Sequence, residues 1–83
     1  MGELIERYEF HEGPTFLGSL TVRILAIGTD ETADRMEATT EDPNGRVITR
    51  EIINGRDVDE LVRRYLSFTH AHGIRMTSAV GVA

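Results

Sequence analysis

Three histidines are the side chains of this sequence best suited to chemistry near neutral pH, because their ordinary pKa lies close to that range. His70 and His72 are two residues apart on a predicted helix, which turns their rings about 200° apart instead of toward one metal ion. If the helix frays, both can reach one ion, with His11 or a carboxylate as a third ligand. The alternative is that helix-end histidines interact with the helix dipole. We expect this structural role, and therefore predict no metal and no cofactor.

Groups for covalent or acid–base catalysis are sparse. His11 and Glu12 are neighbours before the turn at Gly13-Pro14, as a general base and its orienting carboxylate would be, but adjacent turn residues rarely point to the same place. No serine has the glycine-rich surroundings of a nucleophile. The sequence contains no cysteine, which excludes disulfides, thiolate zinc sites and cysteine catalysis. We predict that the protein is not an enzyme.

The charge of the chain counts against two classes of partner. Fourteen acidic and nine basic residues give a net charge of −5, whereas binding to nucleic acid or to an anionic membrane surface favours an excess of basic residues. All the basic residues are arginine, which is typical of a GC-rich, bacterial coding genome. Residues 30–42 alone carry a charge of −5, from six carboxylates and one arginine. This segment is either an acidic surface for a basic partner or, as we expect, a solvated region that aids solubility.

Alternation of apolar and polar residues predicts four strands in the first 53 residues. Leu4–Phe10 fits a strand or a helix, and its aromatic residues favour the strand. Asn44-Gly45 predicts a type I′ hairpin turn between the last two strands. The fourth strand has apolar and polar residues on both faces. A bulge near Arg50-Glu51 would bring its apolar residues onto one face. The other predicted strands lie within residues 15–28, 35–41 and 46–53.

A helix follows, with Asp57 and Glu60 spaced as a capping box and Gly73 as its C-terminal stop. Ile74–Met76 can add a short final strand. Apolar residues recur along the helix at spacings of three and four, which places them on one inward face. That face comprises Val58, Leu61, Val62, Tyr65, Phe68 and Thr69. The five aromatic residues, which we expect in the core between the first strand and the helix, are Tyr8, Phe10, Phe16, Tyr65 and Phe68.

The expected fold is α+β, an antiparallel meander of about four strands with one C-terminal amphipathic helix packed on one face. Residues 1–76 should form a single domain, and residues 77–83 a flexible tail. One helix cannot cover both faces of such a sheet, so apolar residues on the other face should bind a partner. These residues are Leu17, Leu25, Ile27, Ile48 and Ile52.

The leading functional hypothesis is a small non-enzymatic protein-interaction module that forms a homodimer through its sheet face or binds another protein. A second hypothesis is a regulator that contacts DNA through Arg50, Arg63 and Arg64. A third is a ligand-binding protein or enzyme whose site, containing histidine, lies at a subunit interface. No secretory signal is recognisable, and the most apolar stretch, residues 20–28, is too short to cross a bilayer. We therefore expect a soluble, cytoplasmic protein with no membrane partner.

Overall fold

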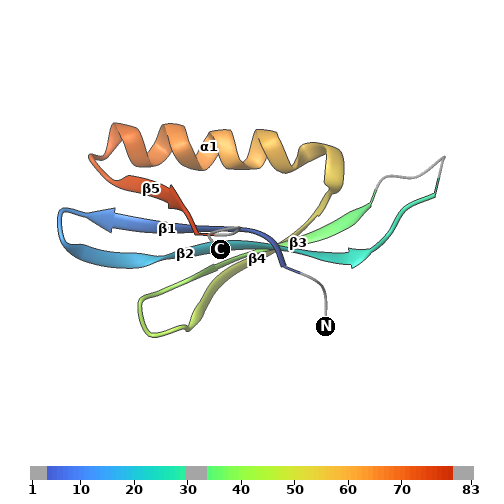
Figure 1. Cartoon of the computed structure of the whole chain (residues 1–83), viewed down its shortest axis with the longest axis horizontal. Helices are drawn as coiled ribbons and strands as arrows, with labels where there is room; N and C mark the ends of the chain where they lie inside the picture. Colours follow the sequence, from blue (N-terminus) through green and yellow to red (C-terminus); the bar gives the residue numbers. More distant parts are fainter. Residues whose placement is uncertain (1–3, 30–33, 80–83) are drawn as a thin grey trace.

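The chain folds as one antiparallel sheet with a helix across one face, as the computed structural model shows for residues 4–29 and 34–79 (Figure 1). The spatial order of the strands is β4-β3-β2-β1-β5. This arrangement confirms the predicted α+β class. The elements are β1 (Leu4–Glu12), β2 (Thr15–Ala26), β3 (Arg35–Glu41), β4 (Val47–Asn54), the 3₁₀ turn η1 (Gly55–Asp57), α1 (Val58–Ala71) and β5 (Arg75–Ser78).

The short final strand forms as expected and extends beyond residue 76. β5 pairs antiparallel with β1, with Thr77 opposite Glu9 and Ser78 opposite Tyr8. The amide of Ala79 then donates to the carbonyl of Arg7 at 2.8 Å. The sheet therefore includes the start of the segment predicted to be a tail. Residues 80–83 of that segment, and residues 30–33 of the acidic connection, lie outside the described residues.

The β3–β4 connection is a hairpin, but the predicted type I′ turn is wrong. Gly45 has a φ of 84°, whereas no described residue other than glycine has a positive φ, so Asn44 does not meet the requirement of that turn. The amide of Gly45 donates to the carbonyl of Asp42 at 3.0 Å. One carboxylate oxygen of Asp42 accepts the amides of Asn44 and Arg46, both at 2.9 Å. The Asp42 side chain thus holds a longer loop closed.

The irregularity of β4 lies at Ile48 and not at the predicted Arg50-Glu51 step. Thr40 pairs with Thr49 while Glu41 pairs with Val47, which leaves Ile48 as the additional residue. The hydroxyls of Thr40 and Thr49 are hydrogen bonded at 2.5 Å. From Thr49 to Asn54 the register is regular, so the bulge falls beside the hairpin turn.

The core lies between α1 and the facing side of the sheet. Its buried apolar residues are Leu20, Val22, Met36, Ala38, Val58 and Leu61. Phe10 and Tyr65 stack across the layer with ring centroids 6.1 Å apart. Two aromatic residues depart from the expected core. Phe68 is 59% exposed because it lies at the margin of the buried helix stripe, and Phe16 packs against His11 on the other side of the sheet.

The start of α1 differs from a capping box. Asp57 occupies the N-cap position, but its side chain makes no capping hydrogen bond. The preceding 3₁₀ turn gives Asp57 a φ of −97° and a ψ of 0°, whereas a capping side chain usually projects from an extended residue. Asp59 and Glu60 in the first turn still complement the helix dipole. Within residues 4–29 and 34–79, no helix combines the length and the apolar character needed to cross a membrane.

Candidate interaction surface

The face of the sheet opposite α1 has a polar centre. Tyr8 and Phe10 face the core, so alternation along β1 points Arg7, Glu9 and His11 to the other side. A row of directly paired residues crosses this face from β1 to β4, namely Arg7, Thr21, Thr39 and Arg50. Thr21 and Thr39 are buried although no helix covers them, because long charged side chains flank them. The centre of this open face is therefore shielded by charged groups.

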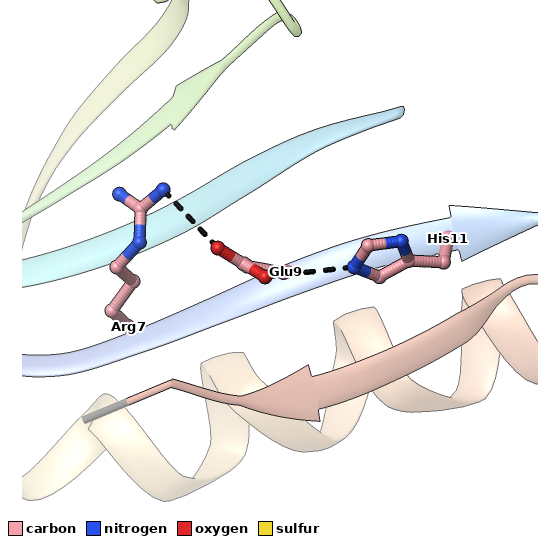
Figure 2. Close-up of polar contacts among 3 residues, drawn as sticks. All are labelled: Arg7, Glu9 and His11. Atoms are coloured by element: carbon pink, nitrogen blue, oxygen red, sulfur yellow. Dashed lines mark ion pairs between the residues drawn. The ribbon is translucent and has the colours of Figure 1, made fainter. Parts of the chain in front are cut away.

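Polar side chains on β1 form a short row along the open face (Figure 2). Glu9 interacts with the Arg7 guanidinium at 3.6 Å and with Nε2 of His11 at 3.5 Å. The ring of His11 also packs against Phe16, with centroids 5.4 Å apart. The acidic partner of His11 is thus Glu9, whereas Glu12 is exposed at the end of the strand.

The structure separates the three histidines. His70 is exposed in the last turn of α1, and the ring of His72 packs on Phe68 with centroids 4.4 Å apart. His11 lies on the face of the sheet opposite the helix. In the described part of the chain, no three histidine or carboxylate side chains are grouped as metal ligands. The described geometry offers no metal-binding arrangement.

The apolar residues predicted as an interface fall into two groups. Leu25 and Ile27 are exposed at the end of β2, and Ile48 and Ile52 are exposed on β4. Leu17 is half-buried at the irregularity between β1 and β2. Arg23 and Glu37, which are paired across β2 and β3, lie between the two groups. Charged side chains therefore interrupt the expected apolar face.

β4 is the most accessible of the long strands. It lies at the border of the sheet and pairs only with β3 (Figure 1). Every residue from Val47 to Ile52 is exposed, including Ile48 at 64% and Ile52 at 49%. We call the unpaired side of this strand the β4 edge. Such an edge presents unpaired backbone amides and carbonyls for pairing with another chain.

A groove separates β4 from the helix on the other face. It has a volume of about 280 Å³ and is lined by Glu51, Leu61, Arg64, Tyr65 and Phe68. It exists because α1 does not extend over β4. Leu66 and Phe68 are exposed on the helix, although the sequence periodicity placed Phe68 in the core. Val47, Leu66 and Phe68 are thus exposed apolar residues that the sequence analysis did not place at the surface.

The three arginines of the DNA hypothesis do not share one surface. Arg63 and Arg64 are exposed on α1, and Arg64 faces the groove beside Glu51. Arg50 lies on the open face, where its Nε is 3.5 Å from Oε2 of Glu37. The sheet therefore separates Arg50 from the two helix arginines, and a carboxylate accompanies each group.

One titratable side chain in the core layer has a perturbed pKa. Burial, the hydrogen bond that the Tyr8 hydroxyl donates to Glu6, and the negative charges of Glu6 and Asp59 raise the pKa of Tyr8 to about 12. All of these effects disfavour the phenolate. Tyr8 is therefore a neutral hydrogen-bond donor at neutral pH.

Comparison of the chain with protein-family models, with curated proteins and with solved structures found no match. The choice of a candidate site therefore depends on the geometry of this chain. Among the described residues, the β4 edge combines exposed apolar side chains with unpaired backbone groups. These two properties together are typical of a strand that pairs with another protein.

Proposed function

We propose that the chain is a small non-enzymatic protein-interaction module that self-associates as a homodimer through its sheet. The observation that carries this proposal is the exposure of Ile48 and Ile52 on a strand with a free edge. A monomer would leave both side chains in water next to unpaired backbone groups. Association removes the apolar surface from water and satisfies the backbone.

Self-association also suits the small size of the chain. A domain of 83 residues buries a smaller share of its surface than a larger domain, so an additional interface contributes a large part of its total stability. A second copy is the simplest partner, because most soluble oligomers are symmetric assemblies of one chain. The exposed Leu25 and Ile27 at the end of β2 remain available for a further protein partner.

The two alternative functions have less support. Contact with DNA would benefit from a continuous basic surface, whereas Arg50 lies on the opposite face from Arg63 and Arg64, and the net charge is −5. A ligand site with histidine would need groups that converge, whereas His11 and His72 each pack against an aromatic ring on different faces of the sheet. Neither arrangement favours a second proposal.

Sedimentation equilibrium over a range of protein concentrations tests the proposal. The unmodified chain should show a reversible monomer–dimer equilibrium, and the double variant Ile48→Thr/Ile52→Thr should shift it at least tenfold toward monomer. Threonine keeps the β-branched shape that suits a strand while it removes apolar surface. Leu66→Gln, which alters an exposed apolar residue of α1, is the control and should leave the equilibrium unchanged. A chain that stays monomeric at every concentration would refute the proposal.

A further inference from the structure

The self-association proposed above gains a specific geometry from β4. We infer that two copies join edge to edge, with β4 antiparallel to β4 of the second copy and Arg50 on the two-fold axis. The two five-stranded sheets then form one continuous ten-stranded sheet with both helices on the same side. This inference depends on the proposed self-association, and it identifies the partner surface as the strand edge instead of the open face.

The apolar and polar positions of β4 are arranged symmetrically about Arg50. Ile48 and Ile52 flank a polar centre made of Thr49, Arg50 and Glu51. In an interface with two-fold symmetry, residue i meets residue j of the other copy and residue j meets residue i. Antiparallel pairing about Arg50 therefore sets Ile48 of each copy beside Ile52 of the other. Ile52 lies on the open face with Arg50, because the register is regular from Thr49 to Asn54, and Ile48, at the bulge, is 64% exposed.

Other symmetric registers lose this match. Directly paired residues of an antiparallel ladder point to the same face. The two-fold axis must therefore pass midway between the two copies of one residue. An axis through Glu51 sets two glutamates directly opposite and places Ile52 beside Arg50, which is unfavourable. An axis through Thr49 places Ile48 beside Arg50. Only the register centred on Arg50 pairs Ile48 with Ile52.

Charge also favours this meeting point. Each chain carries a net charge of −5, so two copies repel one another overall. The β4 strand differs, because its only charged residues, Arg50 and Glu51, cancel and leave it neutral. The two Arg50 side chains that meet on the axis each have Glu37 of their own chain at 3.5 Å. These four charges balance, and the like-charged pair at the centre is compensated.

The opposite border of the sheet is less suited to pairing. β5 has only four residues, and none of them is a large exposed apolar residue. Short edge strands are a common means by which proteins avoid association. β4 has eight residues and exposes three large apolar side chains, those of Val47, Ile48 and Ile52. Edge pairing should therefore occur at β4.

Because the chain contains no cysteine, single cysteines can report on the register. In the inferred pairing, position 50 faces position 50 of the second copy, with Cα atoms about 4.5–5.5 Å apart, which is within disulfide range. Arg50→Cys should therefore form a disulfide dimer rapidly under mild oxidation. Ile48→Cys alone should not, because the two copies of position 48 lie about 13 Å apart along the strands.

A mixture of two variants gives a second readout. Ile48→Cys and Ile52→Cys should each stay largely uncrosslinked, and an equimolar mixture should give the heterodimer at least tenfold faster than either variant alone. Ser67→Cys, on the exposed side of α1, measures the background of random collisions. Circular dichroism confirms that each variant is folded before oxidation.

The outcomes separate this inference from the broader proposal. A chain that sediments as a monomer refutes self-association and edge pairing together. A chain that sediments as a dimer, but whose Arg50→Cys variant crosslinks no faster than Ser67→Cys, retains the proposed function and overturns the edge geometry. Fast crosslinking of Ile48→Cys alone would assign a different register. Dimerisation with fast crosslinking at position 50 and in the mixture supports the inference.

Discussion

The guanidinium Nε of Arg50 lies 3.5 Å from Oε2 of Glu37, on the face of the sheet that α1 does not cover. The Arg50 side chain is 60% exposed, whereas that of Glu37 is 23% exposed between its neighbours. In the monomer, such a pair contributes at most about 1 kcal/mol, because water screens it. In the proposed dimer, Glu37 would compensate an arginine that meets its own copy. The same contact thus matters more for association than for folding.

Glu37→Gln should weaken dimerisation several-fold at low salt, because the two Arg50 side chains then meet without their carboxylates. Added salt should restore much of the affinity by screening the repulsion. Sedimentation equilibrium at two ionic strengths measures both effects. Glu12→Gln removes the same charge from the exposed end of β1, which β2 and β3 separate from β4, and serves as the control. Equal dimer affinities for the unmodified chain and Glu37→Gln at low salt would contradict the prediction.

The fold could be predicted because its signals are local and repeated. Alternation over residues 19–26 predicts a strand that buries Leu20 and Val22, and both are fully buried in the structure. The helix spacing likewise identified Leu61, which is 2% exposed. Details of the turns were harder, because the carboxylate of Asp42 and the 3₁₀ turn before Asp57 select conformations that residue preferences do not fix.

The candidate surface could be predicted only in part from the sequence. Periodicity identified Ile48 and Ile52 as apolar residues in need of a partner, but it does not show which strand is at the border of a sheet. That position depends on β5, which joins beside β1 and leaves β4 free. Phe68 illustrates the same limit, because helix spacing places it inward while the position of α1 leaves it exposed. Tertiary arrangement determines both features.

Gly18→Ala should strongly destabilise the fold. Gly18 has a φ of 140°, and an added Cβ would lie 2.2 Å from the carbonyl oxygen of Glu41 on β3. Backbone strain and the clash together should cost about 2–4 kcal/mol of unfolding free energy, as measured by urea denaturation. Gly13→Ala is the matched control, because Gly13 also has a positive φ but nothing lies within 4 Å of its added Cβ. It should cost only about 1 kcal/mol. Similar losses for both variants would argue against the close approach at Gly18.

Leu61→Ala and Phe68→Ala should differ sharply, although both alter large apolar residues of α1. Leu61 is buried against the sheet, so its truncation should cost about 2–5 kcal/mol of unfolding free energy. Phe68 is 59% exposed and packs on the ring of His72, so its truncation should cost less than about 1 kcal/mol. Urea denaturation of the two variants measures the difference. A larger loss for Phe68→Ala would place that residue in the core, as the sequence spacing suggested.

Stability should fall at alkaline pH because of Tyr8. Its pKa is raised to about 12 in the folded chain, against an ordinary value of 10.0, so the folded state favours the protonated hydroxyl. The stabilisation from this protonated group is fully present below pH 10 and is lost as the pH rises toward 12. Urea denaturation at several pH values across this window should show the decline.

Tyr8→Phe tests the assignment, because it removes the titrating group but keeps the ring. This variant should be less stable at pH 8, since it lacks the hydrogen bond to Glu6, and its stability should decline less between pH 10 and 12. Glu6→Gln should have an intermediate effect, because burial and Asp59 still raise the pKa of Tyr8 when the Glu6 charge is absent. If Tyr8→Phe loses stability with pH as steeply as the unmodified chain, another group is responsible for the alkaline decline.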